Sequence, residues 1–287
     1  MSYLKIMTNH FFRSPSNARL LAASIFLLSL ITTSLLVISI VSAPAFAQAA
    51  NKPRAVDSLP ITIEATEFLE WNQTEGTYIA KGNAFVQQNQ ASIKAEHIIA
   101  RYIAGSETRD ITRVIATGAV TYIEGENTAS GDKLDYNLNA NIYVLTGIKS
   151  SVESPRGIMT ATESITHDAT DGSNRKVTAT GNARYKNDDG RTVFGDKLIA
   201  HIEVDGTLKN INAYGNTKVT TNNGTTATAD RLNYVAITSL ANLDGNVEII
   251  SEENVMRGAK AKIDFKNEIS RIISVPGGER VSGTLTP

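Results

Sequence analysis

A six-residue phrase that recurs along the chain most strongly constrains its fold. GDKLDY at 131–136 returns as GDKLIA at 195–200 and as ADRLNY at 229–234. A glycine marks the same period, with successive spacings of 36, 29, 34, 34 and 30 residues and the phrase's Leu or Ile 16 to 18 residues further on. These glycines are Gly82, Gly118, Gly147, Gly181, Gly215 and Gly245. Six units of ~30–35 residues indicate a repetitive architecture.

The hydrophobic pattern within each unit is that of β-strands. Apolar and polar residues alternate, Val, Ile, Thr and Tyr dominate, and no window beyond Ile61 shows a helical spacing of apolar residues. The runs are separated by the polar segments QQNQ, EGEN, NDDG, TNNG and SEEN, and Asp-Gly and Asn-Gly pairs favour tight hairpin turns. The sequence therefore predicts an all-β protein of repeated antiparallel hairpins.

The phrase supplies one apolar face of a strand. Residues two apart share a face, so Leu134 and Tyr136 point the same way and Asp135 points to the other side. The same pairing holds for Ile98 with Ala100, Leu232 with Tyr234, and Ile263 with Phe265. Stacked hairpins would bury a continuous apolar strip, either as a closed sandwich core or as a partly open groove. Periodicity alone does not choose between the two.

An acidic residue occupies the second position of the phrase in most units. We expect it at the first position of its strand, near the rim, where its carboxylate would accept hydrogen bonds from backbone N–H groups of the adjoining turn. These residues are Glu96, Asp132, Asp196 and Asp230, and Ala261 takes the place in the last unit.

The N-terminal segment has the organisation of a secretory signal peptide. Basic residues precede a long apolar run over 20–41, and Pro44 and an Ala-x-Ala site ending at Ala47 follow it. The sequence predicts cleavage after Ala47, a linker over 48–60 and an exported domain over 61–287. The alternative is an uncut membrane anchor, because the apolar run reaches the ~20 residues that span a bilayer.

Composition and motifs argue against an enzyme, a metalloprotein and a nucleic-acid-binding protein. The 287 residues carry a net charge of −1 and no cysteine. His97, His167 and His201 lie in different repeats without metal-ligand spacing, and no nucleophile or phosphate-loop motif occurs. We interpret these histidines as structural, and the acidic pairs at 188–189 and 252–253 as solvated turn residues. We predict no catalytic residue, no metal site and no cofactor.

The repeat resembles the OstA-like family over about 61–285. The resemblance is carried by ITIEATEFLEW at 61–71, YIAKGNAFVQQNQASIKAEHI at 78–98 and GGERVSGTLTP at 277–287. The chain carries more hairpins than the shortest members, so it is predicted to contain two tandem segments, about 61–170 and 171–287. The resemblance implies an elongated, partly open β jelly roll in the periplasm that carries lipopolysaccharide, with the acyl chains of lipid A in its apolar trough.

The resemblance also implies partners: an inner-membrane export component of the same fold, the N-terminal domain of an outer-membrane translocon, and further copies joined head to tail by strand addition. Edge strands near 61–67 and 279–285 would make those contacts. Burial of acyl chains at ~0.8 kcal/mol per CH₂ explains why such a lipid needs a carrier. The predicted trough residues are Ile61, Ile63, Val86, Ile98, Val120, Tyr122, Leu134, Tyr136, Leu198, Leu232, Tyr234 and Ile249.

Two alternatives keep the same fold. One is a membrane-anchored component of the same pathway, if residues 20–41 are retained. The other is a structural or adhesive β-repeat protein with a closed core and no ligand.

Overall fold

The structure is a computed structural model that describes residues 61–286 apart from 106–108 and 279. The predicted signal peptide 1–47, its cleavage site at Ala47 and the linker 48–60 lie outside the described residues. The described residues belong to one compact unit, Leu59–Pro287.

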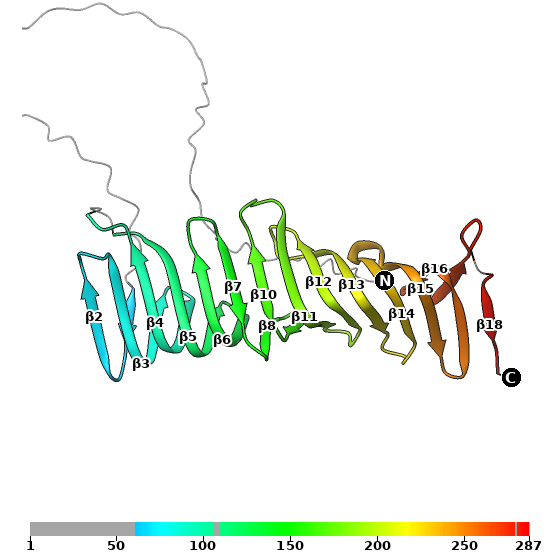
Figure 1. Cartoon of the computed structure of the whole chain (residues 1–287), viewed down its shortest axis with the longest axis horizontal. Helices are drawn as coiled ribbons and strands as arrows, with labels where there is room; N and C mark the ends of the chain where they lie inside the picture. Colours follow the sequence, from blue (N-terminus) through cyan, green and yellow to red (C-terminus); the bar gives the residue numbers. More distant parts are fainter. Residues whose placement is uncertain (1–60, 106–108, 279, 287) are drawn as a thin grey trace, which may run out of the picture. The chain divides into compact units, whose positions relative to one another are not determined.

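The described residues of this unit form antiparallel strands and one 3-10 turn, Ala236–Thr238, so the all-β prediction is confirmed (Figure 1). The strands are β1 Thr62–Glu64, β2 Phe68–Asn72, β3 Thr77–Gln88, β4 Ala91–Tyr102, β5 Ile111–Glu124, β6 Asn127–Asn137, β7 Ile142–Thr146, β8 Ser150–Ser154, β9 Gly157–Ala161, β10 Ser164–Asp168, β11 Arg175–Asn187, β12 Thr192–Ile202, β13 Leu208–Thr220, β14 Thr226–Val235, β15 Leu240–Ser251, β16 Asn254–Asp264, β17 Ile269–Ile273 and β18 Ser282–Thr284.

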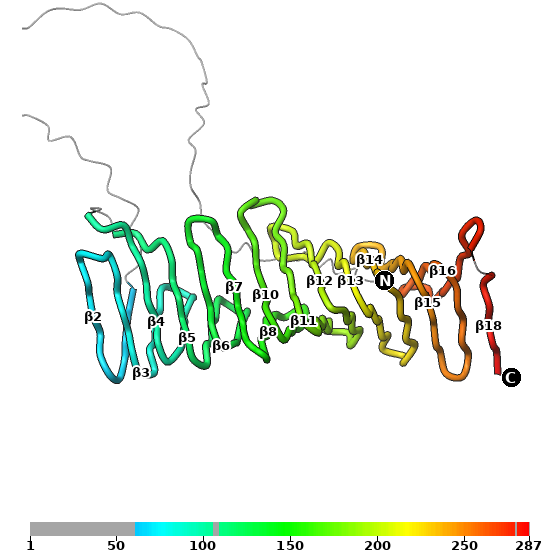
Figure 2. The backbone as a smooth tube through the Cα atoms, viewed as in Figure 1, coloured from blue at the N-terminus to red at the C-terminus, as the bar shows by residue number. Residues whose placement is uncertain are grey.

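Successive hairpins pair in chain order from β3 to β6 and from β11 to β16, and Figure 2 follows the backbone back and forth through them. At three places in the array, two short strands pair with the same long strand, one with each half of it. β1 and β2 both pair with β3, and β17 and β18 both pair with β16. In the middle, β7 and β8 both pair with β6, while β9 and β10 both pair with β11.

Each long strand therefore has two halves that belong to two half-sheets. Half-sheet 1 contains β2, β7, β10 and β17 with the halves of the long strands that pair with them, and half-sheet 2 contains β1, β8, β9 and β18 with the other halves. A register shift separates the two halves, for example between Thr117 and Val120 of β5. We call this bend the corner.

The recurring glycine and the recurring acid meet at the corner. Gly215 has φ +68° and Gly245 φ +81°, and the asparagine after each is also left-handed. The side-chain amide of Asn216 donates to both carboxylate oxygens of Asp196, at 3.2 and 3.0 Å. Asn246 binds Asp230 of the preceding strand at the same two distances. The repeat thus encodes a bend held by a side-chain contact between neighbouring strands.

The structure at the corner shows that two predictions about the recurring acid are wrong. The phrase does not begin a strand, because Asp132 lies in the middle of β6 and Asp196 in the middle of β12. The acid is exposed on the outside of the bend, and at Asp196 and Asp230 it binds asparagine side chains instead of turn N–H groups. Strict alternation assigned it to the apolar face because the sequence does not show that facing reverses across the bend.

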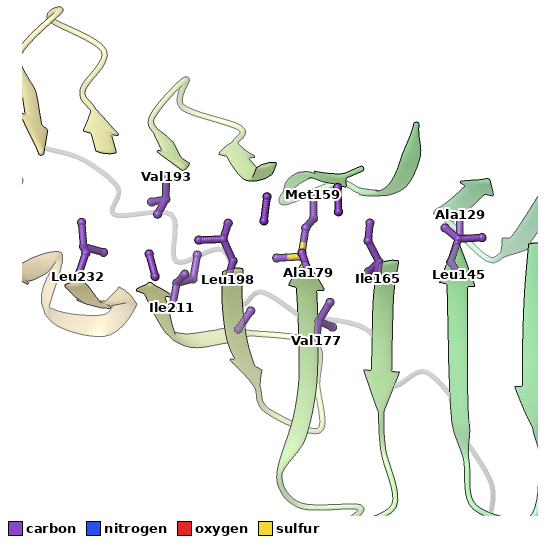
Figure 3. Close-up of a cluster of buried hydrophobic side chains, with 14 of the residues drawn as sticks. Ala129, Leu145, Met159, Ile165, Val177, Ala179, Val193, Leu198, Ile211 and Leu232 are labelled. Carbon is purple, nitrogen blue, oxygen red and sulfur yellow. The ribbon is translucent and has the colours of Figure 1, made fainter. Parts of the chain in front are cut away.

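Apolar side chains from the two half-sheets fill the interior between them. Figure 3 shows Leu145, Ile165 and Leu198 on one side, with Met159 and Val193 facing them from the other. A continuous buried cluster extends through the hairpins, from Ala80 in β3 to Ile263 in β16.

Candidate functional site

Three rows of side chains line the interior away from the corner of half-sheet 2, and in each row every residue is directly opposite the next across the strand pairing. The inner row of half-sheet 1 is Leu69, Ala80, Ile98, Ala116, Leu134, Leu145, Ile165, Ala179, Leu198, Ala213, Leu232, Leu243, Ala261 and Ile272. Thirteen steps of ~4.8 Å give this row a length on the order of 60 Å. Every member is apolar, so the interior offers one uninterrupted apolar strip.

The outer row of half-sheet 1 lies two residues further from the corner. It is Trp71, Tyr78, Ala100, Val114, Tyr136, Tyr143, His167, Val177, Ala200, Ile211, Tyr234, Ala241 and Ile263. This row contains most of the interior aromatic rings.

The opposite row belongs to half-sheet 2 and faces the other two. It is Ile63, Val86, Ile93, Tyr122, Ala129, Val152, Met159, Tyr185, Val193, Val219, Ala227, Ile249 and Met256.

The structure brings the predicted trough residues onto these interior rows, with two exceptions. Val120 sits between the rows, next to the corner, and is buried. Ile61 precedes β1 and is 42% exposed at the N-terminal edge. The remaining ten divide among the inner row (Ile98, Leu134, Leu198 and Leu232), the outer row (Tyr136 and Tyr234) and the opposite row (Ile63, Val86, Tyr122 and Ile249).

The interior is closely packed in this conformation. Leu134 and Leu198 are at most 1% exposed. A cavity of about 20 Å³ lies between Leu232 and Tyr234 on one side and Val193 and Val219 on the other, which is room for about one water molecule. A larger, open pocket of about 240 Å³ lies among Ile148, Ser150, Thr160 and Asn182. Between the packed rows, acyl chains would enter only if the half-sheets moved apart.

The half-sheets approach each other along a seam opposite the corners. The rings of Tyr122 and Tyr143 face each other across it, with centroids 6.1 Å apart. Further along, the Arg191 guanidinium lies 5.5 Å from the centre of the Phe265 ring, while Asp189 pairs with the same guanidinium. Side-chain packing of this kind joins the half-sheets at the seam, whereas continuous backbone joins them at the corner, so the seam is where separation would require least disruption.

One stretch of the outer row is polar, and Arg175 lies next to it. The sequence predicted Tyr136 as a trough residue and His167 as a structural histidine, but did not indicate Tyr143 or Arg175. We call Tyr136, Tyr143, His167 and Arg175 the polar cluster. The Tyr143 and His167 rings lie 4.6 Å apart, and Tyr136 meets Tyr143 edge-on at 5.7 Å. Arg175 precedes Val177 by two residues in β11, and strand alternation therefore gives it the same facing as that interior residue. Face parity from Ile165 and Val177 could have identified His167 and Arg175 in the sequence.

Burial and the neighbouring charges hold the polar cluster in defined protonation states. Burial lowers the pKa of His167 to about 4, and the Arg175 charge acts in the same direction, so its imidazole is neutral at pH 7. Burial and the Glu124 carboxylate raise the pKa of Tyr143 and of Tyr136, so both hydroxyls keep their protons and remain donors.

The described residues contain no group of three or more His, Cys, Asp and Glu side chains placed to bind a metal ion. Nor does that part of the chain include a helix with the length and hydropathy of a membrane span.

Both ends of the strand array expose apolar side chains. At the N-terminal end, Phe68 of β2 is 44% exposed and Leu69 56%. At the C-terminal end, Ile269 and Ile273 of β17 are 55% and 42% exposed. These strands lie close to the ranges predicted as edges.

Comparison with known families now decides the class of the protein. The family model described as LptA/(LptD N-terminal domain) LPS transport protein matches residues 62–173 and again residues 163–269. The chain belongs to this family. Membership in the LptA/LptD N-terminal family makes it an OstA-like lipopolysaccharide transport protein of a non-enzymatic class, with two overlapping matches that meet near β10.

Among solved structures, the chain is similar to LptH of Pseudomonas aeruginosa, described as the LptA homologous periplasmic component of the conserved lipopolysaccharide transport device. The identity is 12%, the match covers 80% of this chain and 96% of that chain, and the TM-score is 0.22. At that score the superposition carries no argument about how the hairpins are arranged. No curated protein matches the chain.

Proposed function

We propose that this protein is a periplasmic lipopolysaccharide carrier of the LptA type, which shields lipid A acyl chains between its two half-sheets. The observation that carries the proposal is the inner row, an apolar strip that passes through every strand of half-sheet 1 in register. Such a strip attracts hydrocarbon without a directional trap, because burial of apolar surface is non-directional. A lipid can therefore move along it as well as bind to it.

The closed interior sets a condition on this function. Because the cavity has room for about one water molecule, binding must separate Tyr122 from Tyr143 and Arg191 from Phe265 along the seam. Burial of the acyl chains offsets the cost of this separation, at ~0.8 kcal/mol for each CH₂ removed from water. Residues of the inner row then pack against lipid instead of against the other half-sheet.

The two ends support the proposed bridging role. β2 and β17 contain exposed apolar residues, and short strands at both ends leave backbone groups open to pairing. We propose that these edges add strands from neighbours: an inner-membrane export component of the same fold, the N-terminal domain of the outer-membrane translocon, and further copies head to tail. Two tandem segments, about 61–170 and 171–287, would lengthen each bridge.

Photo-crosslinking in living cells tests the carrier function. A photo-reactive phenylalanine derivative is placed at Leu134, Tyr136 or Leu232 and, as matched outward controls, at Asp135 and Asn233. Lipopolysaccharide adducts from the interior positions and none from the controls are expected. Adducts from the controls alone would mean that the interior never admits lipid.

Tyr136 and Tyr234 provide the safer sites for this experiment. Both are half-buried, and an aromatic label replaces an aromatic ring there. Leu134 is 1% exposed, so a larger side chain at that position would strain the packing.

The packed interior also favours a second candidate, a structural β-repeat protein without a ligand. The two candidates differ in whether the seam opens. A spin-label pair across the seam, one label on β5 and one on β7, should give a longer distance distribution when lipopolysaccharide is added if the protein is a carrier. An unchanged distribution under saturating lipid would favour the structural candidate.

We propose the periplasm as the location, after export and cleavage at Ala47. The alternative is an inner-membrane protein that retains residues 20–41. The mass of the protein purified from cells distinguishes them, because cleavage leaves a chain that begins at Gln48.

A further inference from the structure

The polar cluster interrupts the outer row, whose other residues are apolar or aromatic. The outer row contains one histidine, His167, and no Asp, Glu, Lys or Arg. Arg175 lies near His167, on the neighbouring strand β11. The inner row directly beneath, from Leu134 to Ala179, stays apolar. The polar cluster therefore lies near the seam, and the inner row beneath it remains an unbroken apolar strip.

Two nitrogen atoms of the polar cluster have no partner among the described residues. The Nε of Arg175 and the Nδ1 of His167 are buried, and neither has a hydrogen-bond partner there. A buried polar atom left without a partner destabilises the fold, and a charged group does so more strongly. Other buried atoms of the described residues also lack partners, among them Nη1 of Arg191, so the case for a ligand rests on the Arg175 cation together with its neighbours.

The nearby carboxylates do not neutralise Arg175. Glu124 accepts a hydrogen bond from the Tyr122 hydroxyl at 3.0 Å. Asp168 points to the outer face, where its carboxylate lies 3.5 Å from Lys176. Among the ion pairs of the described residues, Arg175 takes part in none.

The four side chains of the cluster thus include hydrogen-bond donors and no carboxylate, and the carboxylate that acts on its tyrosines is that of Glu124, which the Tyr122 hydroxyl binds. The guanidinium of Arg175 brings a planar set of N–H groups suited to a tetrahedral oxyanion, and the raised pKa values keep Tyr136 and Tyr143 protonated. An oxyanion at this place would accept from the unpaired Nε and neutralise a partly desolvated cation.

We propose that the polar cluster is a subsite for the phosphorylated headgroup of an amphiphile whose tails lie on the inner row below. This inference rests on the proposed function and deepens it by naming a binding site for the charged part of the cargo. The headgroup binds at the seam, and of the four cluster residues His167 lies where the two family matches overlap, at residues 163–173. It holds the cargo midway between the two segments.

Binding of two amphiphiles with the same tail tests the proposal. Dodecyl phosphate and dodecyl maltoside, each below its micelle concentration, are titrated calorimetrically into the purified protein. The wild type is expected to bind dodecyl phosphate at least about 10-fold more tightly. Arg175→Met should reduce that preference to less than about 2-fold.

Lys176→Met is the matched control. It removes one positive charge from the next residue of the same strand, but on the outer face, so the preference should persist. If Lys176→Met abolishes the preference as fully as Arg175→Met does, net charge explains it and the subsite is refuted.

Inorganic phosphate separates a headgroup site from a site for the free ion. Phosphate should shift the His167 imidazole resonance in the wild type with an affinity at least about 10-fold weaker than that of dodecyl phosphate. Equal affinities would show that the tail contributes nothing and would overturn a headgroup site.

A thermal measurement checks that the variant remains folded. Arg175→Met should melt no lower than the wild type without ligand, because it removes an unpaired partly buried cation, and dodecyl phosphate should raise the melting temperature of the wild type alone. If Arg175→Met does not fold, Arg175→Gln gives the same comparison. Equal binding of both amphiphiles by the wild type would refute the subsite only, whereas binding of neither would refute the proposed function as well.

Discussion

The corner glycine Gly245 should be among the least replaceable residues on the surface of this protein. An alanine there would keep φ at +81°, which costs roughly 1–2 kcal/mol for a residue with a side chain. Its methyl group would overlap an oxygen of Asp230 and lie 2.9 Å from its carboxyl carbon, so one of the two must move. Asp230 can turn away only by giving up its two hydrogen bonds from Asn246, at about 0.5–1.5 kcal/mol each, or else the overlap strains the corner by a similar ~1–3 kcal/mol. We expect Gly245→Ala to lower the free energy of unfolding by about 2–5 kcal/mol.

Gly190 provides the control for the backbone part of this cost. Its φ is +93°, and an added methyl group would meet nothing within 4 Å, so Gly190→Ala should cost only the ~1–2 kcal/mol of the left-handed conformation. Urea unfolding followed by circular dichroism measures both variants.

Asp230→Ala isolates the contact across the corner. Alone it removes the two hydrogen bonds from Asn246, worth about 0.5–1.5 kcal/mol for such a bond. Combined with Gly245→Ala it also removes the atoms that the new methyl group would strike, so the double variant should lose at least about 1 kcal/mol less than the sum of the single variants. Strict additivity, or a Gly245→Ala cost no larger than that of Gly190→Ala, would refute the corner argument.

Three further predictions concern the interior and the outer face. Leu198→Ala, at a site with 0% exposure, should cost ~2–5 kcal/mol in urea unfolding, and a loss below about 1 kcal/mol would mean that the interior is loosely packed. The pKa of His167 is about 4 in the folded state and 6.5 in the unfolded state, so the unfolded state binds the proton first as pH falls. The free energy of unfolding should therefore be highest above pH 6.5 and decline by up to ~3 kcal/mol towards pH 4. His167→Gln should remove this decline in unfolding free energy between pH 6.5 and pH 4. An NMR titration of His167 with a midpoint near 6.5 would contradict the prediction. The ion pair between Arg113 and Asp135 lies on the outer face at 2.6 Å with Arg113 half-exposed, so Arg113→Ala should cost less than ~1 kcal/mol, and a larger loss would show that the pair stabilises the sheet more than a surface ion pair does.

Local patterns in the sequence were enough to determine the strand class, the repeat and the facing of most strand residues. Alternation is a local property, and side chains such as Leu134 and Tyr136 point inward wherever the strand is placed. The polar segments between runs, such as NDDG with its Asp-Gly pair, are turns in the structure for the same local reason. The family resemblance, carried by three short segments, agrees with the match over 62–173 and 163–269.

Only the tertiary structure decided where each strand bends and what lies across from it. Asp196 was assigned to a strand's first position because nothing in the local pattern indicates that the strand continues through the glycine corner and reverses its facing there. His167 and Arg175 lie in different hairpin segments, and their proximity depends on the pairing of β10 with β11. Whether Leu198 and Leu232 face open space or a second half-sheet is likewise a long-range fact, because alternation specifies the direction of a side chain but not the distance to whatever it meets.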